Sequence, residues 1–385
     1  MQKGITVVGA LNLDFITKFR TGDDSEIRTW GRDDEVLVSD NTWWNLFYRH
    51  LPGRLHWISP GGSAANTGAA LAAIDPQLKV QVIGLVGKDP EAAFLTSPEQ
   101  WFGAKLDIDF VDEMRTGRAF SYLFPQEGRK IAVAKGCNIL FRRELVNRVP
   151  ESVDWLHASS FAGESENQEL AGFLQLARRK CGKVTISMDP GRFLTTDGLT
   201  DTATRLLREC DVLFTKTTEL FNLSGVSDEG TDEAKRLRAV EMLRQRTGTG
   251  LSIIVERIPN GYSVYRPATA PQKVEFEGGP IPPPADDTGA GDVFNAAFIY
   301  GYLRGLSPEA SARLIRSTLQ RHLRSEGRSG FSQFCKAAPI IFASHSSKDK
   351  RFVQEFIRQF EGTEVTFWLD ESDMTLGATL QETIR

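Results

Sequence analysis

Short apolar runs alternate with longer helix-forming segments, and this alternation constrains the fold more than any other feature of the sequence. The apolar runs are rich in β-branched residues, as buried parallel strands are. They lie at Ile5–Leu11, Val80–Val86, Val184–Met188, Val212–Thr215 and Ile253–Glu256. Helix-forming segments lie between several of them, at Ser63–Ile74, Glu166–Lys180 and Asp232–Arg246. This order predicts an α/β fold, in which helices cover both faces of a doubly wound, mainly parallel sheet.

Two stretches depart from the alternation. Residues 17–57 are rich in charge, lack a clean period and hold four of the seven tryptophans. We interpret them as a lid with an apolar underside, and an irregular surface insertion is the alternative. Phe120–Phe124 and Ile131–Ala134 flank Glu127-Gly128, which indicates a β-hairpin rather than a strand–helix–strand unit.

Charge and composition limit the partners of the chain. The formal net charge of −4 gives no reason to expect nucleic acid or an anionic membrane. Phosphates can still be held by backbone N–H groups. The four cysteines form no CxxC pair and the five histidines show no metal-ligand spacing, so neither disulfides nor zinc are predicted. Because there is no secretory signal and no run near the roughly 18 apolar residues of a spanning helix, we expect a soluble, cytoplasmic protein.

The motif Asp287-Thr-Gly-Ala-Gly-Asp292 leads into a predicted helix over Asp292–Leu303. Small residues and two glycines before a helix let several backbone N–H groups point into one concavity at its positive end. Such a concavity suits a transferring phosphoryl group. Asp292 lies beside it and can accept the proton of an attacking hydroxyl. A helix cap without a chemical role is the alternative.

Two further motifs lie where open α/β sheets bind ligands. Gly61-Gly-Ser-Ala-Ala-Asn66-Thr67 is a second glycine turn that opens a helix, and its glycines allow close approach to the backbone. Asn66 offers both a donor and an acceptor to sugar hydroxyls. Asn12-Leu-Asp14 directly follows the first strand, at its expected carboxyl end.

Together these motifs resemble those of the ribokinase/PfkB family of sugar and nucleoside kinases. GGSAANT at 61–67, DTGAGD at 287–292 and NLD at 12–14 occur in the family's order and spacing, and the likeness covers about residues 1–330. Three further segments agree with it, at Gly84–Asp89, Gly136–Asn138 and Asp189–Arg192.

The resemblance implies an ATP-dependent transfer of the γ-phosphate to a hydroxyl of a sugar or nucleoside, with Mg²⁺ as cofactor. Asp292 would be the catalytic base, and the backbone of Gly289, Ala290 and Gly291 the anion hole. Substrate hydroxyls would contact Asn12, Asp14, Gly62 and Asn66. The nucleotide would contact Lys216, Thr288 and Gly261. Glu219 would bind magnesium, directly or through water. A small β lid from about residues 15–57 and 118–135 would close over a ribokinase-like fold.

Two positions depart from the family pattern. The family's Asn-x-x-Glu appears here as Lys216-Thr-Thr-Glu219, so lysine replaces asparagine, and Ile258 stands where a further glycine is usual. Both positions border the expected nucleotide site. They favour an alternative function, a kinase-fold sensor of a nucleoside or sugar that regulates a signalling or defence effector.

The C-terminal segment has its own motifs. A strand over Ile340–Ala343 runs into Ser344-His-Ser-Ser-Lys-Asp349, and Trp368-Leu-Asp-Glu371 follows a predicted helix. The pattern resembles the beginning of a TIR domain, a flavodoxin-like fold. We therefore expect a linker at 331–338 and an incomplete TIR domain at 339–385. The glutamate with which enzymatic TIR domains cleave NAD lies on a later helix, so NAD cleavage is not expected. Self-association stays open: a homodimer, and TIR–TIR contacts if the domain is complete.

Overall fold

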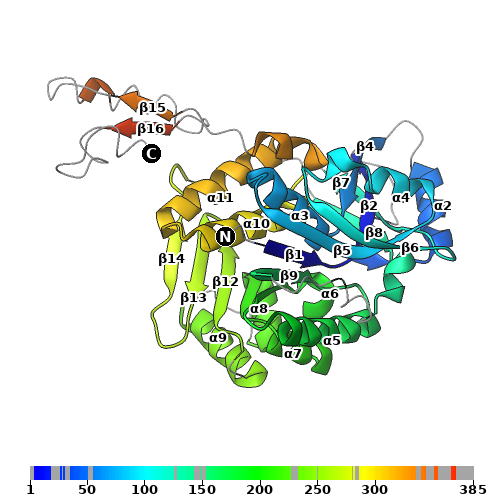
Figure 1. The fold of residues 1–385 in the computed structure, drawn as a ribbon, viewed down its shortest axis with the longest axis horizontal. Helices are drawn as coiled ribbons and strands as arrows, with labels where there is room; N and C mark the ends of the chain where they lie inside the picture. Colours follow the sequence, from blue (N-terminus) through cyan, green and yellow to red (C-terminus); the bar gives the residue numbers. More distant parts are fainter. Residues whose placement is uncertain are drawn as a thin grey trace.

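The computed structural model describes residues 4–18, 27, 29–30, 35–50, 55–124, 128–142, 148, 153–226, 233–248, 250–279, 281, 286–334, 340–343, 351–353 and 366–369. Within these ranges the chain forms a nine-stranded sheet, a five-stranded sheet and a separate pair of strands (Figure 1).

The nine-stranded sheet has the order β14-β13-β12-β11-β10-β9-β1-β5-β6. All neighbours from β12 to β6 pair in parallel, while β13 and β14 join antiparallel at one edge. Its strands are β1 (Gly4–Val8), β5 (Lys79–Gly87), β6 (Lys105–Val111), β9 (Trp155–Ser159), β10 (Thr185–Asp189), β11 (Val212–Lys216), β12 (Ile253–Ile258), β13 (Gly261–Tyr265) and β14 (Gln272–Glu275). The predicted mainly parallel sheet is confirmed.

Helices cover both faces of this sheet (Figure 1). Because successive side chains of a strand point to opposite faces, Val7 of β1 packs in one core and Val8 in the other. The first core includes α3 (Ser63–Ile74), α10 (Ala290–Arg304) and α11 (Pro308–Leu323). The second includes α5 (Glu164–Cys181), α7 (Asp201–Arg208), α8 (Thr217–Ser224) and α9 (Glu233–Thr247). Two short helices, α4 (Pro90–Leu95) and α6 (Gly191–Thr195), follow strands.

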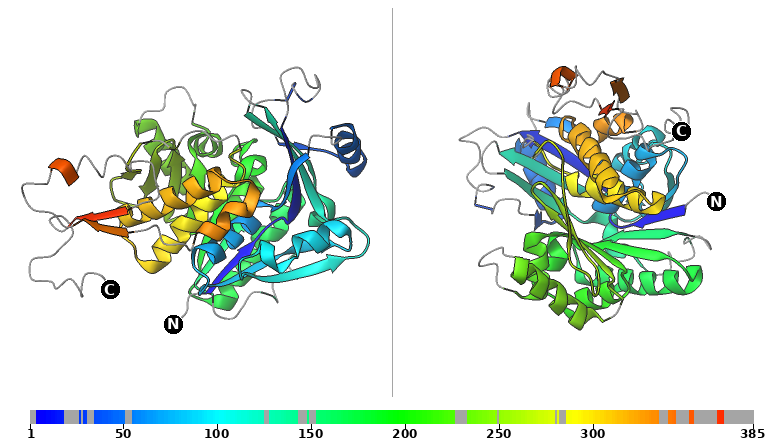
Figure 2. Two further views of the ribbon diagram at one scale, coloured as in Figure 1. Left: turned by 90° about the horizontal axis from the view of Figure 1, so that it is seen from above. Right: turned by 90° about the vertical axis from the view of Figure 1, so that its left-hand side faces the viewer.

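A second sheet stands beside the first, with a helix on its outer side (Figure 2). Its order is β3-β8-β7-β2-β4, from β3 (Glu35–Leu37), β8 (Gly128–Ala134), β7 (Gly117–Phe124), β2 (Asn12–Lys18) and β4 (Leu55–Gly61). The helix is α2 (Asp40–His50), whose Trp43 stacks on Phe47 and meets Phe15 of β2 edge to face, each at 5.1 Å between ring centroids. An aromatic cluster thus stabilises this sheet.

Asn12 to Asp14 follow the first strand, as the sequence indicates, but they already belong to a strand of the second sheet. These residues begin β2, which pairs antiparallel with β4 and parallel with β7. Leu13 and Phe15 lie in the aromatic core. Because strand side chains alternate, Asp14 therefore points to the opposite face, where it is also buried.

The expected linker at 331–338 begins too early. Residues Gly327–Gln333 form a 3₁₀ helix, η4, and both Phe331 and Phe334 belong to the hydrophobic core beneath α11. Arg321 of α11 is buried beside η4 and donates to the carbonyls of Gln333 at 2.5 Å and Phe334 at 3.3 Å. The chain up to residue 334 is therefore part of the large domain.

The C-terminal segment contributes one described pair of strands. β15 (Ile340–Ala343) and β16 (Thr366–Leu369) pair in parallel, from Ile340 opposite Thr366 to Ala343 opposite Leu369. The Ser344–Asp349 motif, together with Asp370 and Glu371, lies outside the described residues. Across the described ranges, no helix is both long and apolar enough to cross a membrane.

The burial of η4 can be tested by truncating Phe331, which is 1% exposed and packs on Phe102 and Phe334. We expect Phe331→Ala to lower the free energy of unfolding by about 3–5 kcal/mol, because it leaves a cavity in the core. Phe110→Ala on β6 is the matched control, since that ring is 52% exposed, and it should cost less than about 1 kcal/mol. Equal losses in urea unfolding of the two variants would show that η4 is not part of the core.

Candidate active site

The starts of α3 and α10 meet at one buried carboxylate. Asp292 lies in the first turn of α10 and is 7% exposed. Asn66, in the first turn of α3, donates from Nδ2 to Asp292 Oδ2 at 2.9 Å. Thr67 Oγ1 donates to the backbone carbonyl of Asp292 at 3.3 Å. Two of the predicted motifs, 226 residues apart, are thus joined by hydrogen bonds.

Burial raises the pKa values of two carboxyl groups to near neutral pH. It raises the pKa of Asp292 from 3.8 to about 7, and the charge of Asp189 adds to this rise, while Asn66 and Arg257 oppose it. Burial likewise raises the pKa of Asp14 to about 7, against the pull of Arg328 and Arg129. A carboxyl group with a pKa near 7 can both accept and release a proton at physiological pH.

The paired glycines at the start of α3 make room for the second carboxylate. A Cβ on Gly61 would lie 2.1 Å from Asp14 Oδ2, so only glycine leaves space for that side chain. Gly62 has a φ of +94°, and a Cβ there would lie 2.0 Å from the carbonyl oxygen of Ala10. The predicted substrate role of Gly62 thus comes with a structural one.

The glycine turn before α10 has a left-handed glycine at the helix start, and the N–H of its middle residue, Ala290, is already hydrogen-bonded. Gly289 caps the helix in the left-handed conformation, at a φ of +81°. A Cβ on Gly291 would lie 2.8 Å from Arg257 Nη1. The Ala290 N–H donates to the carbonyl of Asp287 at 3.0 Å. To bind a phosphoryl oxygen, Ala290 would have to give up that bond.

A pocket opens beside Asp14, Asn66 and Gly289, whereas Asp292 is not among its lining residues. Its walls combine the second sheet, the start of α3, the loop before α10, the end of α11 and η4. It is lined by Asp14, Ile16, Ser59, Pro60, Asn66, Asp286, Thr288, Gly289, His322, Gly327, Arg328 and Phe331. Of the predicted substrate residues, the pocket therefore includes Asp14 and Asn66. Asn12 lies elsewhere, where its Oδ1 accepts a hydrogen bond from Asn138 Nδ2 at 3.0 Å.

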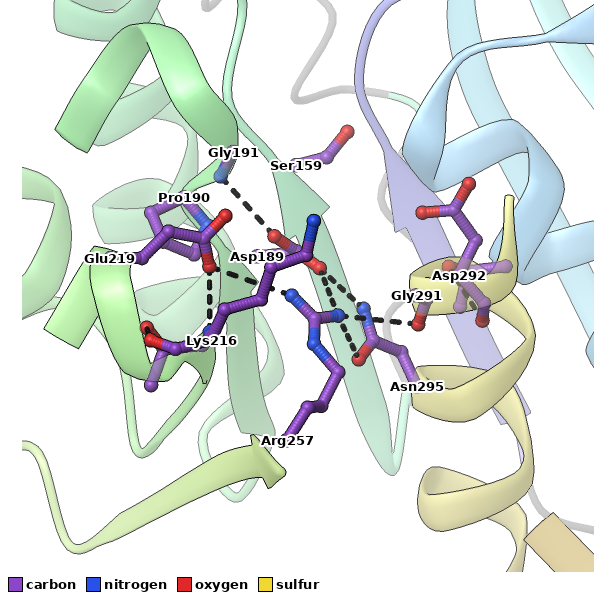
Figure 3. Close-up of polar contacts among 12 residues, drawn as sticks. Ser159, Asp189, Pro190, Gly191, Lys216, Glu219, Arg257, Gly291, Asp292 and Asn295 are labelled. Carbon is purple, nitrogen blue, oxygen red and sulfur yellow. Dashed lines mark hydrogen bonds and ion pairs between the residues drawn. The ribbon is translucent and has the colours of Figure 1, made fainter. Parts of the chain in front are cut away.

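Arg257, which the sequence analysis did not identify, contacts the glycine turn at residues 289–291 (Figure 3). Arg257 Nη1 donates to Asp189 Oδ2 at 2.9 Å, to Asn295 Oδ1 at 3.2 Å and to the Gly291 carbonyl at 3.3 Å. Its Nη2 lies 3.6 Å from Glu219 Oε2. Burial disfavours the charge of Asp189, yet Arg257 and Asn295 hold the pKa of that carboxyl below its usual range. This ion-pair network fixes the second turn of α10.

The predicted magnesium ligand is engaged by protein groups. Glu219 Oε2 accepts the Lys216 N–H at 2.8 Å across the start of α8 and faces Arg257 as well. Asp189 accepts from Asn295 Nδ2 at 2.7 Å and from the Gly191 N–H at 3.2 Å. Among the described ranges, no three His, Cys, Asp or Glu side chains are grouped as metal ligands. These carboxylates do not fit a preformed magnesium site.

The remaining predicted nucleotide contacts have local structural roles. Gly261 begins β13 opposite Ile258, and a Cβ there would lie 2.0 Å from the carbonyl oxygen of Val274. Sheet packing alone thus accounts for this glycine. Thr288 accepts at Oγ1 from Arg129 Nη1 at 3.0 Å, and its carbonyl oxygen lies 2.8 Å from His322 Nε2. Thr288 therefore links the second sheet to α11 at the edge of the pocket.

Comparisons with known proteins show which family and which fold this chain resembles. A family model described as pfkB family carbohydrate kinase matches residues 54–314. An uncharacterized sugar kinase of Archaeoglobus fulgidus is 25% identical over 238 residues, which are 62% of this chain and 88% of that protein. An ATP-dependent ribose-1-phosphate kinase of Halopiger xanaduensis is 28% identical over 253 residues, 64% of this chain and 74% of that one.

Solved structures share the fold. The adenosine kinase from Sinorhizobium meliloti superposes with a TM-score of 0.69 at 18% identity, and covers 86% of this chain and 98% of its own. The Arabidopsis thaliana ribokinase complexed with ribose and ATP superposes with a TM-score of 0.63 at 19% identity, and covers 87% and 99% respectively.

The raised pKa of Asp292 gives a stability prediction with a defined sign. Between pH 3.8 and about 7 the folded protein holds a proton that the unfolded chain has released, so stability falls as pH rises through this window. Asp292→Asn carries no charge and should remove this loss. Relative to wild type, we expect it to gain about 1–3 kcal/mol in free energy of unfolding between about pH 5 and about pH 8.

Urea unfolding of both proteins at the two pH values measures this gain. Asp197→Asn is the control, because Asp197 is exposed and its substitution should give no pH-dependent difference. A stability difference between Asp292→Asn and wild type that stays constant with pH would contradict the raised pKa.

Proposed function

Because this chain belongs to the pfkB family of carbohydrate kinases, we propose that it transfers the γ-phosphate of ATP to a hydroxyl of a sugar or nucleoside, with Asp292 as the base. The observation that carries this proposal is the buried Asp292 carboxylate, held by Asn66 at the first turn of α10. Its pKa of about 7 suits a group that must accept a proton at neutral pH.

In the proposed step Asp292 takes the proton of the acceptor hydroxyl. The hydroxyl oxygen forms a bond to the γ-phosphorus while the bond to the bridging oxygen breaks, and that oxygen leaves with the electron pair as part of ADP. Charge that develops on the phosphoryl oxygens would be stabilised by the backbone N–H groups around Gly289 and by the positive end of α10. The Asn66 amide orients the base, because its Nδ2 donates to one carboxylate oxygen.

Asp14 is proposed to read the acceptor hydroxyls. It lies in the same pocket as Asn66, and the absence of a Cβ at Gly61 leaves its carboxylate room. The residue ranges 15–57 and 118–135 supply most of the second sheet and α2, which we propose as the lid. The substrate class is supported by the names of similar proteins. They include a ribose-1-phosphate kinase, a ribokinase complexed with ribose and ATP, and an adenosine kinase.

The proposed function does not use Glu219 or Asp189 as a direct magnesium ligand. Glu219 and Asp189 already bind Arg257 and backbone N–H groups. Arg257 instead provides fixed positive charge next to the carbonyl of Gly291. Its pKa is raised further by Asp189 and Glu219, although burial opposes this, so it stays cationic.

The assignment of the base is tested by Asp292→Ala. We expect turnover to fall about 10²–10⁴-fold, because a general base is lost, while nucleotide and sugar still bind. Asp197→Ala, at an exposed position, is the matched control and should turn over like wild type. ADP release is measured across a panel of sugars and nucleosides. Undiminished ADP release by Asp292→Ala would refute its role, and a wild type that binds but never turns over would favour the sensor function.

We also propose that residues 339–385 begin a TIR domain separate from the kinase. The parallel pairing of β15 with β16 supports this, because successive strands of a flavodoxin-like sheet pair in this way. The core residues Phe331 and Phe334 mark the end of the kinase domain.

This boundary predicts the outcome of two truncations. A chain that ends after Phe334 should phosphorylate its acceptor with kcat/KM within about twofold of the full chain, because the domain core is intact. A chain that ends after Glu326 should lose activity, since it lacks η4 and its pocket residues Gly327, Arg328 and Phe331. If the chain that ends after Phe334 loses activity, the C-terminal segment is part of the kinase domain.

A further inference from the structure

Arg328 is a buried cation in the wall of the substrate pocket. It lies on η4 and is 4% exposed. Its Nε donates to Asn66 Oδ1 at 3.0 Å and its Nη1 to the carbonyl of Gln100 at 3.2 Å. The guanidinium also lies over the ring of Trp101, 4.6 Å from its centroid. Three of its sides are thus occupied by neutral groups.

One nitrogen of this guanidinium has no partner. Nη2 is buried and has no hydrogen-bond acceptor anywhere in the described part of the chain. No carboxylate of those residues lies within ion-pair distance of Arg328 either, although Asp14 and Asp292 are near enough to stabilise its charge. Burial lowers the pKa of Arg328 to about 9, so the side chain is still cationic at neutral pH. A buried guanidinium with an unfilled donor strongly favours an anionic acceptor.

A second guanidinium lies next to a residue of the pocket wall. Arg129 of β8 donates from Nη1 to Thr288 Oγ1 at 3.0 Å, and Thr288 is part of the pocket lining. The charges of Arg129 and Arg328 both act on Asp14, which lines the pocket together with Arg328. The pocket therefore presents a carboxylate for hydroxyls and the guanidinium of Arg328 for an anion, with the positive charge of Arg129 nearby.

The side-chain amide of Asn66 lies between the guanidinium of Arg328 and the carboxylate of Asp292 and sets the distance between them. Asn66 donates from Nδ2 to Asp292 and accepts at Oδ1 from Arg328 Nε. Only the width of this side-chain amide separates the two charged groups. A ligand that touches both would carry its acceptor hydroxyl and its anionic group a few bonds apart. That spacing suits one small sugar better than a nucleoside.

We propose that the acceptor is a sugar that carries its own anionic group, a phosphate ester or a carboxylate, which Arg328 Nη2 binds in the pocket. This inference rests on the proposed function and names its substrate class. Arginine suits the role because its planar donors match the oxygens of either group. Arg328 would thus choose among acceptors, while Asp292 carries out the proton transfer.

Calorimetric binding without ATP tests the inference independently of turnover. The probes are ribose 1-phosphate, ribose 5-phosphate, ribonate, ribose and adenosine. Wild type should bind one of the three anions at least about 10-fold tighter than ribose and adenosine, as expected for a charge-assisted hydrogen bond in a buried site. The phosphate and carboxylate probes distinguish the two kinds of anion.

Variants assign the preference to Arg328. Arg328→Met should lose the preference for the anion about 10-fold or more and leave the affinity for ribose within about threefold, whereas Arg328→Lys should keep part of the preference. Arg304→Met, an exposed arginine on α10, is the matched control and should bind like wild type. If wild type binds ribose or adenosine as tightly as the three anionic probes, or more tightly, the proposal is overturned. This result does not require that Arg328→Met folds. An equal loss for anionic and neutral sugars in Arg328→Met would also overturn the proposal, since Arg328 would then act only by holding Asn66.

The proposed function can fail separately. If the anion binds with the expected preference but no ADP is released when ATP is added, the anion subsite stands and the kinase reaction does not. If ribose or adenosine is phosphorylated efficiently and the anions are not bound, the kinase reaction stands and the anion subsite does not.

Discussion

The hydrogen bond between Asn66 and Asp292 is the contact on which the rest of the site depends. It joins the first turn of α3 to the first turn of α10, two helices that cover the same face of the main sheet. Both helix starts lie at positive dipole ends, which lowers the cost of placing a carboxylate there. The same amide accepts from Arg328, so α3, α10 and η4 meet at one side chain. Because each polar atom of that amide is used, its orientation is fixed.

Much of the fold could be predicted, because buried parallel strands and their covering helices have strong sequence patterns. The central strand β9 was missed because His157 interrupts a short apolar run, and in the structure its Nδ1 lies 2.8 Å from Ser187 Oγ on the next strand. The strand β2 was missed because polar Asn12 and Asp14 alternate with apolar residues at its start. That alternation is itself a strand signal, but over three residues it is too short to recognise.

The residues of the candidate site also fall into two groups, those that lie in a recognisable local motif and those that do not. Asp292, Asn66 and Asp14 were predicted because each lies in a short local motif, and the structure places Asp14 and Asn66 in one pocket with Asn66 bonded to Asp292. Arg257 and Arg328 were not predicted, because a buried arginine is recognised only by its partners. Those partners are distant in sequence: Arg328 bonds to an asparagine 262 residues away. No local pattern marks such a residue, and the segment that soon follows Arg328, residues 331–338, was predicted to be a linker.

The long sequence distance between the segments that line the pocket has a consequence for how the chain folds during synthesis. The pocket takes one wall from β2, among the first segments to be synthesised, and another from η4, which is synthesised after all other parts of the kinase domain. Contacts between such distant segments form late, because the entropy of closing a long loop must be offset first. During translation, the early half of the domain can build sheet and helices, but the pocket carboxylate of Asp14 lacks the neighbouring guanidinium of Arg328 until η4 emerges. Ligand binding is therefore reserved for molecules whose kinase domain is complete.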